Sequence, residues 1–93
     1  MPKKPKGAVA PHAQIVRWRD HCDPLDGPWH SIDAARRVEP VVFCTVGWII
    51  RETDEFIVMT STLGEGPVAE VVGSPTVILT DAILDRAPLD VAD

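Results

Sequence analysis

The sequence contains no tyrosine, only two phenylalanines, and no lysine beyond its sixth residue. It also lacks a long apolar run, since none approaches the ~18 consecutive residues that a membrane-spanning helix needs. The stretch AVAPHAQIV after the basic start is interrupted by proline and polar residues, so it lacks the continuous apolar segment of a signal peptide. We therefore expect a soluble, cytoplasmic protein with no membrane partner.

Cysteine is scarce as well. Cys22 and Cys44 allow at most one disulfide bond, and Cys44 lies in an apolar run, where a free cysteine behaves as a small hydrophobic residue. We predict that both are reduced thiols.

Charge is distributed unevenly along the 93 residues. All three lysines lie in the first six residues, so the rest of the chain carries six arginines against fourteen acids. An acidic body disfavours binding to a nucleic-acid backbone, which depends on Lys and Arg replacing counterions. We interpret residues 1–10 as a disordered basic tail, 11–88 as a single domain and 89–93 as a flexible C-terminus.

Proline is absent from one long stretch, because none of the nine prolines falls between Val41 and Gly66. Proline cannot donate to a β-ladder, so the central strands are expected there. Residues 41–51 and 55–62 are rich in β-branched and apolar side chains and are separated by the polar tetrapeptide ETDE. This pattern predicts a β-hairpin with a solvated tip.

Shorter sequence patterns predict the remaining strands and a short helix. AQIVRWRD alternates as a strand with Val16 and Trp18 on one face, and Ser31 is a good N-cap for a short helix that Pro40 ends. Further on we predict short strands at 68–72, 76–80 and 84–86, with one helical turn at DAI. Strand, helix, long hairpin, strand, helical turn and strand is typical of a mostly β fold: a small SH3-like bent barrel of about five strands with one short α-helix.

The apolar positions of these strands define the expected core. Trp48 shares one face of its strand with other apolar residues, so we interpret it as a core residue in preference to a ligand-binding residue. The residues predicted to be buried are Val42, Val46, Trp48, Ile50, Ile57, Met59 and Ile78.

Three segments, VRWRD…GPWHSIDAARRVEP, TVGWIIRETDEFIVMTSTL and VILTDAILD, together resemble small proteins encoded in bacteriophage and prophage genomes, in which a VGW-type strand leads into an acidic hairpin. The resemblance covers about residues 15–85. It implies a phage-related protein with an SH3-like barrel in the bacterial host cytoplasm, and it implies no activity.

Catalytic and metal motifs are missing from the sequence. It has no nucleophile elbow, no phosphate-binding glycine loop and no metalloprotease helix, so we predict a protein that is not an enzyme and needs no cofactor. His12, His21, Cys22 and His30 supply zinc-ligand types, but their spacing matches no standard zinc module. We predict no metal site.

One aromatic residue lies outside the apolar pattern. Trp29 occupies a polar loop, GPWHS, and arginines precede and follow it in the sequence. Guanidinium groups bind phosphate in a bidentate manner and an indole stacks on a base, so the pattern indicates a site for a small anionic ligand. The predicted ligand-binding residues are Arg17, Arg19, Trp29, Arg36 and Arg37. The alternative is that these arginines pair with neighbouring acids, namely Asp20, Asp23, Asp26 and Asp33.

Two functional hypotheses follow from the sequence. The first is a non-enzymatic phage-related accessory protein that binds a protein partner or itself, as a homo-oligomer, because the apolar content is high for so small a chain. The alternative is a counter-defence protein that sequesters a small anionic or nucleotide-like ligand.

Overall fold

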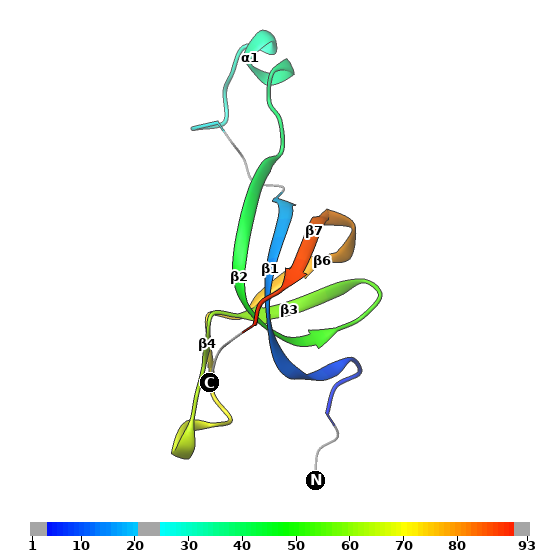
Figure 1. The fold of residues 1–93 in the computed structure, drawn as a ribbon. Helices are drawn as coiled ribbons and strands as arrows, with labels where there is room; N and C mark the ends of the chain where they lie inside the picture. The colour runs from blue at the N-terminus through cyan, green and yellow to red at the C-terminus, as the bar shows by residue number, and fades with distance from the viewer. Residues whose placement is uncertain (1–3, 21–24, 91–93) are drawn as a thin grey trace.

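The computed structural model describes residues 4–20 and 25–90, and it is mostly β with one short α-helix (Figure 1). Two 3-10 turns, Gly66–Val68 and Thr80–Ala82, also connect strands. The helix and strands are β1 (Ala8–Asp20), α1 (Ile32–Arg36), β2 (Val41–Glu52), β3 (Phe56–Thr60), β4 (Thr62–Leu63), β5 (Val72–Gly73), β6 (Thr76–Leu79) and β7 (Ile83–Pro88).

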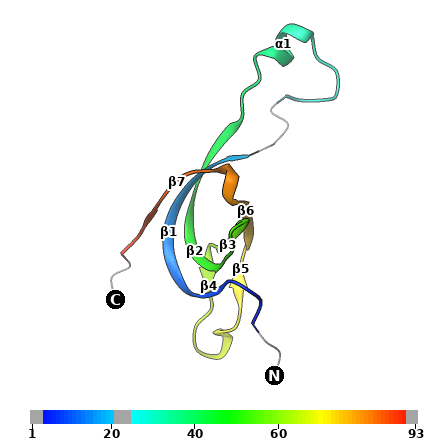
Figure 2. The ribbon, with the colours of Figure 1, turned by 90° about the vertical axis from the view of Figure 1, so that its right-hand side faces the viewer.

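Five strands form one antiparallel sheet in the order β6-β3-β2-β1-β7, and β4 and β5 form a separate two-stranded sheet. The larger sheet is strongly curved, so β3 and β6 lie opposite the arcs of β1 and β2 (Figure 2). Within this curve lies a small core from four strands, made of Val16, Ile49, Ile57, Met59 and Ile78.

The predicted hairpin is confirmed. β2 and β3 pair antiparallel, and Thr53 closes the turn between them: its Oγ1 accepts hydrogen bonds from the amides of Glu55 and Phe56 at 3.2 and 3.1 Å. Asp54 and Glu55 are exposed at the tip. These acids therefore belong to a solvated turn, as the sequence predicts.

The predicted core is only partly right. Ile57, Met59 and Ile78 are buried as expected, but Val42 and Val46 are 46% and 56% exposed. Trp48 and Ile50 are half-buried, while Val16 and Ile49 were missing from the predicted set and are fully buried.

Pairing with β1 explains the error on β2. Val16 lies opposite Thr45, and the Trp18 indole Nε1 donates to Thr45 Oγ1 at 2.8 Å. Since directly opposed residues share a face of a sheet, this register directs Thr45 inward and Val46 outward. The apolar face that the sequence suggests for the first half of β2 is therefore its outer face.

One predicted strand differs from the structure, and backbone contacts are made near both ends of the predicted domain. β1 begins at Ala8, inside the segment interpreted as a tail, and the Gly7 carbonyl accepts from the Glu52 amide at 2.8 Å. At the other end, the Leu89 amide donates to the Ala13 carbonyl at 2.9 Å. The strand predicted at 68–72 is wrong, because the Gly66–Val68 turn and the two-residue β5 occupy that segment. Glycine and proline around it favour turns over a ladder.

The helix begins as predicted, and it lies on a projection. Ser31 Oγ accepts from the Ala34 amide at 3.0 Å, and α1 contains no buried residue. We call residues 25–40 the arm, which extends away from the curved sheet (Figure 1). The radius of gyration is 16.9 Å, whereas a compact chain of this length would have about 12 Å. Among the described residues, no helix is long and apolar enough to cross a membrane.

Candidate interaction surface

The residues predicted to bind a ligand lie on two parts of the molecule. Arg17 and Arg19 are exposed on β1, whereas Trp29, Arg36 and Arg37 lie on the arm. Trp29 is 90% exposed. No hydrogen bond or ring contact joins it to any of these arginines within residues 4–20 and 25–90. A shared ligand site remains a prediction.

Two of these arginines have acidic partners. Arg17 Nη1 lies 2.7 Å from Asp85 Oδ2 across β1 and β7, and Arg37 Nη2 lies 3.1 Å from Asp33 Oδ2. The second pair is one of those that the alternative interpretation foresaw. Both pairs are largely exposed, where an ion pair contributes only about 0–1 kcal/mol.

Arg19 and Arg36 make no ion pair in the described part of the chain. Of the predicted site residues, these two guanidinium groups are the ones available to an external anion or acidic side chain. A cation–π contact among the described residues involves other side chains, with the Arg51 guanidinium 4.9 Å from the Phe56 ring centroid.

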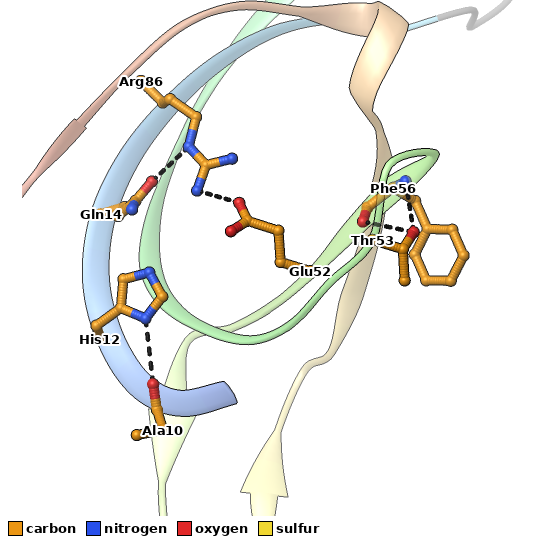
Figure 3. Close-up of polar contacts among 7 residues, drawn as sticks. All are labelled: Ala10, His12, Gln14, Glu52, Thr53, Phe56 and Arg86. Atoms are coloured by element: carbon orange, nitrogen blue, oxygen red, sulfur yellow. Dashed lines mark hydrogen bonds and ion pairs between the residues drawn. The ribbon is translucent and has the colours of Figure 1, made fainter. Parts of the chain in front are cut away.

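A polar cluster on the concave side of the sheet was not foreseen from the sequence. Arg86 on β7 donates from Nε to Gln14 Oε1 at 2.7 Å, and its Nη2 lies 2.5 Å from Glu52 Oε1 (Figure 3). The three residues come from β7, β1 and β2, and the side chains of the ion pair are 30% and 39% exposed. Because the guanidinium is directed at protein acceptors, this cluster fastens the last strand to the first two.

An apolar pocket lies between the base of the arm and β6. Its volume is about 530 Å³, and its apolar lining consists of Trp18, Pro40, Val77, Ile78, Leu79 and Ala82. Three charged residues, Arg19, Asp20 and Asp81, complete the lining. The pocket lining is thus mostly apolar with a few charged side chains, which is the usual composition of a binding site for an aromatic side chain or small ligand.

Two walls of this pocket are built differently. On one side the Trp18 indole is held by its hydrogen bond to Thr45 and by the Phe43 ring, whose centroid is 5.5 Å away. On the other side Val77 and Leu79 are 60% and 57% exposed, on a strand whose pairs within the described residues are with β3 alone. A rigid aromatic wall therefore faces an uncharged strand at the edge of the sheet.

A second apolar area lies on the outer face of β2. Val42 and Val46 flank Cys44, and all three are exposed. Cys44 was interpreted as a small hydrophobic residue in an apolar run, and its free thiol is exposed to solvent on this face. Cys22, like His21, lies outside the described residues.

The remaining histidines each contact a backbone carbonyl two or three residues earlier in the chain. His12 Nδ1 lies 3.1 Å from the Ala10 carbonyl oxygen (Figure 3), and His30 Nε2 lies 2.7 Å from that of Gly27. In residues 4–20 and 25–90, no group of three or more His, Cys, Asp or Glu side chains is arranged to hold a metal ion.

Comparison with known proteins adds no further constraint, since no protein-family model, curated protein or solved structure matches this chain. The functional argument therefore depends on the surface of the molecule itself.

Proposed function

We propose that this chain is a non-enzymatic accessory protein that acts by binding protein, and that it associates with itself as a homo-oligomer. The observation that carries the proposal is the imbalance between buried and exposed apolar side chains. Five large apolar residues are buried in the described part of the chain, whereas twelve are exposed. Scattered exposed apolar residues are ordinary, but apolar side chains that line a pocket are typical of an interaction site.

The arm supports the same proposal. It carries Trp29, Ile32 and Val38, which are 90%, 69% and 40% exposed. Tryptophan is among the residues that contribute most to binding when buried at a protein interface. An arm that extends exposed apolar side chains away from its own core is better suited to contacting another chain than to stabilising its own.

The finer description of the fold is also part of the proposal. The sheet places β1, β2, β3 and β6 side by side as antiparallel neighbours, and β7 returns beside β1 after the Thr80–Ala82 turn. Together with the strong curvature of the sheet, this order supports an SH3-like barrel. A phage origin, with action in the bacterial host cytoplasm, rests on the resemblance of the VGW-type strand and its acidic hairpin.

Sedimentation equilibrium of the purified full chain tests self-association. We expect a reversible dimer or higher oligomer at protein concentrations between about 1 and 100 µM, the range of ordinary reversible interfaces. A monomer throughout that range would refute the homo-oligomer.

A second candidate function is sequestration of a small anionic or nucleotide-like ligand. One observation favours it: exposed Trp29 and Arg36, which has no ion pair in the described residues, lie on the same arm. An indole and a guanidinium together suit a base and a phosphate. Calorimetric titration with cyclic and linear nucleotides tests it, with Arg36→Ala as the variant. The absence of heat with every nucleotide, or binding unchanged in the variant, would contradict this function.

A further inference from the structure

We propose that two copies of this chain exchange arms, so that Trp29 of each copy enters the apolar pocket beside β6 of the other. This inference rests on the proposed self-association and goes further by naming the two surfaces that meet. The occupant of the pocket is therefore a segment of a second copy.

The first argument is the match between an exposed aromatic side chain and an apolar pocket of suitable volume. Trp29 is 90% exposed on the part of the arm that precedes α1, and the pocket has a volume of about 530 Å³. Volumes of about 300–1,000 Å³ accommodate groups larger than an indole. Inside the pocket the incoming ring would meet Trp18, which its bond to Thr45 already holds in one orientation. Aromatic pairs add to the effect of burial alone.

The second argument is the position of the pocket at the base of the arm. Asp20, at the end of β1, and Pro40, immediately before β2, both line it. The arm extends from this base away from the sheet (Figure 1). A two-fold axis between two antiparallel arms brings the far part of each arm next to the base of the other. Such a contact is closed and self-complementary, and it stops at two subunits.

The third argument is charge. The pocket lining carries Asp20 and Asp81 together with Arg19, and none of the three forms an ion pair in the described part of the chain. The arm carries Arg36, which is likewise without an ion pair there. Exchange of arms brings this cation toward Asp20 and Asp81 of the other subunit, which outnumber Arg19 in the same lining. In an acidic chain such a pairing orients the two copies and opposes their general repulsion.

The test uses two variants that each damage one of the two surfaces. Trp29→Ala removes the inserted side chain, and Leu79→Arg blocks the pocket through a residue that is 57% exposed, so neither substitution disturbs the core. The matched control is Val71→Arg, at a residue with 58% exposure that lies between the Gly66–Val68 turn and β5. Near-ultraviolet circular dichroism verifies the fold of each variant.

Native mass spectrometry and sedimentation then measure each variant alone and in mixture. We expect Trp29→Ala and Leu79→Arg each to dimerise about 100-fold or more weakly than the wild type, since each dimer loses two contacts of a centrally buried tryptophan. The Val71→Arg control should dimerise like the wild type.

The mixture is the decisive measurement. A heterodimer of the two damaged chains restores one complete contact, because Trp29 of the Leu79→Arg chain can enter the intact pocket of the Trp29→Ala chain. We expect this heterodimer to be about 10-fold or more tighter than either variant homodimer, because it regains one of the two lost contacts. A heterodimer no tighter than the homodimers would overturn arm exchange.

The other outcomes are also informative. If Trp29→Ala dimerises like the wild type while Leu79→Arg does not, pairing of two β6 edges replaces arm exchange as the explanation, and self-association stands. If both variants dimerise normally, the interface lies elsewhere, and the outer face of β2 becomes the next surface to test. A wild-type chain that stays monomeric would refute arm exchange and self-association together.

Discussion

The orientation of β2 can be tested by shortening one side chain on each of its faces. Ile49 is fully buried in the core, whereas Val46 is 56% exposed on the outer face. Ile49→Ala removes three carbon atoms from a packed site at about 0.8 kcal/mol each and leaves a cavity, so the expected loss is about 3–4 kcal/mol. Val46→Ala removes two carbon atoms that are roughly half in water, and the expected loss is below about 1 kcal/mol.

Urea unfolding followed by tryptophan fluorescence measures both losses. With an m-value of about 1 kcal/mol per molar for a domain of this size, Ile49→Ala shifts the midpoint by about 3 M or unfolds the protein, whereas Val46→Ala shifts it by less than about 1 M. All samples must have the same protein concentration, because self-association couples to stability. If Val46→Ala were as destabilising as Ile49→Ala, the assignment of inner and outer faces on β2 would be wrong.

Two further substitutions test how the sheet is held together. Gly47→Ala should destabilise the fold by about 2 kcal/mol or more in the same assay, because an added Cβ would clash with the backbone carbonyl oxygen of Thr60. The control Gly27→Ala, at a position with open space around it, should cost about 1 kcal/mol. Equal losses in the two variants would contradict close packing of Gly47. Arg86→Leu should lower the free energy of unfolding by about 1–2 kcal/mol, because it removes the bonds to Gln14 and Glu52. Amide hydrogen exchange at Leu89 should also become faster, because β7 loosens from β1. Unchanged exchange at Leu89 would show that the cluster does not fasten β7.

Local signals in the sequence located most of the elements. The absence of proline between Val41 and Gly66 marks the central hairpin, and Ser31 marks the start of the helix. These features are set by residues close to one another in the chain, since a cap or a turn depends on backbone groups three or four positions away. Such features can be predicted without knowing how the strands pair.

The two faces of β2 could not be assigned in this way. Both alternating sets of residues in VVFCTVGWII are largely apolar, so the strand pattern does not say which set is buried. The choice depends on the register with β1, and a shift between Ile49 and Arg51 in the pairing with β3 changes the alternation again. Both the register and its shift depend on residues that are far apart in the sequence.

The candidate sites show the same limit. Gln14 and Arg86 are 72 positions apart, and the pocket joins Trp18 to Leu79, so no local pattern could indicate either arrangement. The exposure of Trp29 was indicated, because it alone among the three tryptophans lies in a polar, proline-bounded loop. The sequence did not indicate which surface could bind the Trp29 side chain.

The arm and the core are thus ordered by different interactions. Ser31 caps α1 and Asp33 pairs with Arg37 inside the arm, so local contacts hold this short helix. A helix of five residues is marginal by itself in water. Docking of Trp29 on a second copy would bury part of the arm and stabilise the folded state by mass action. In this scheme, a domain with so few buried side chains gains stability as its concentration rises, and its effective core includes a residue contributed by another chain.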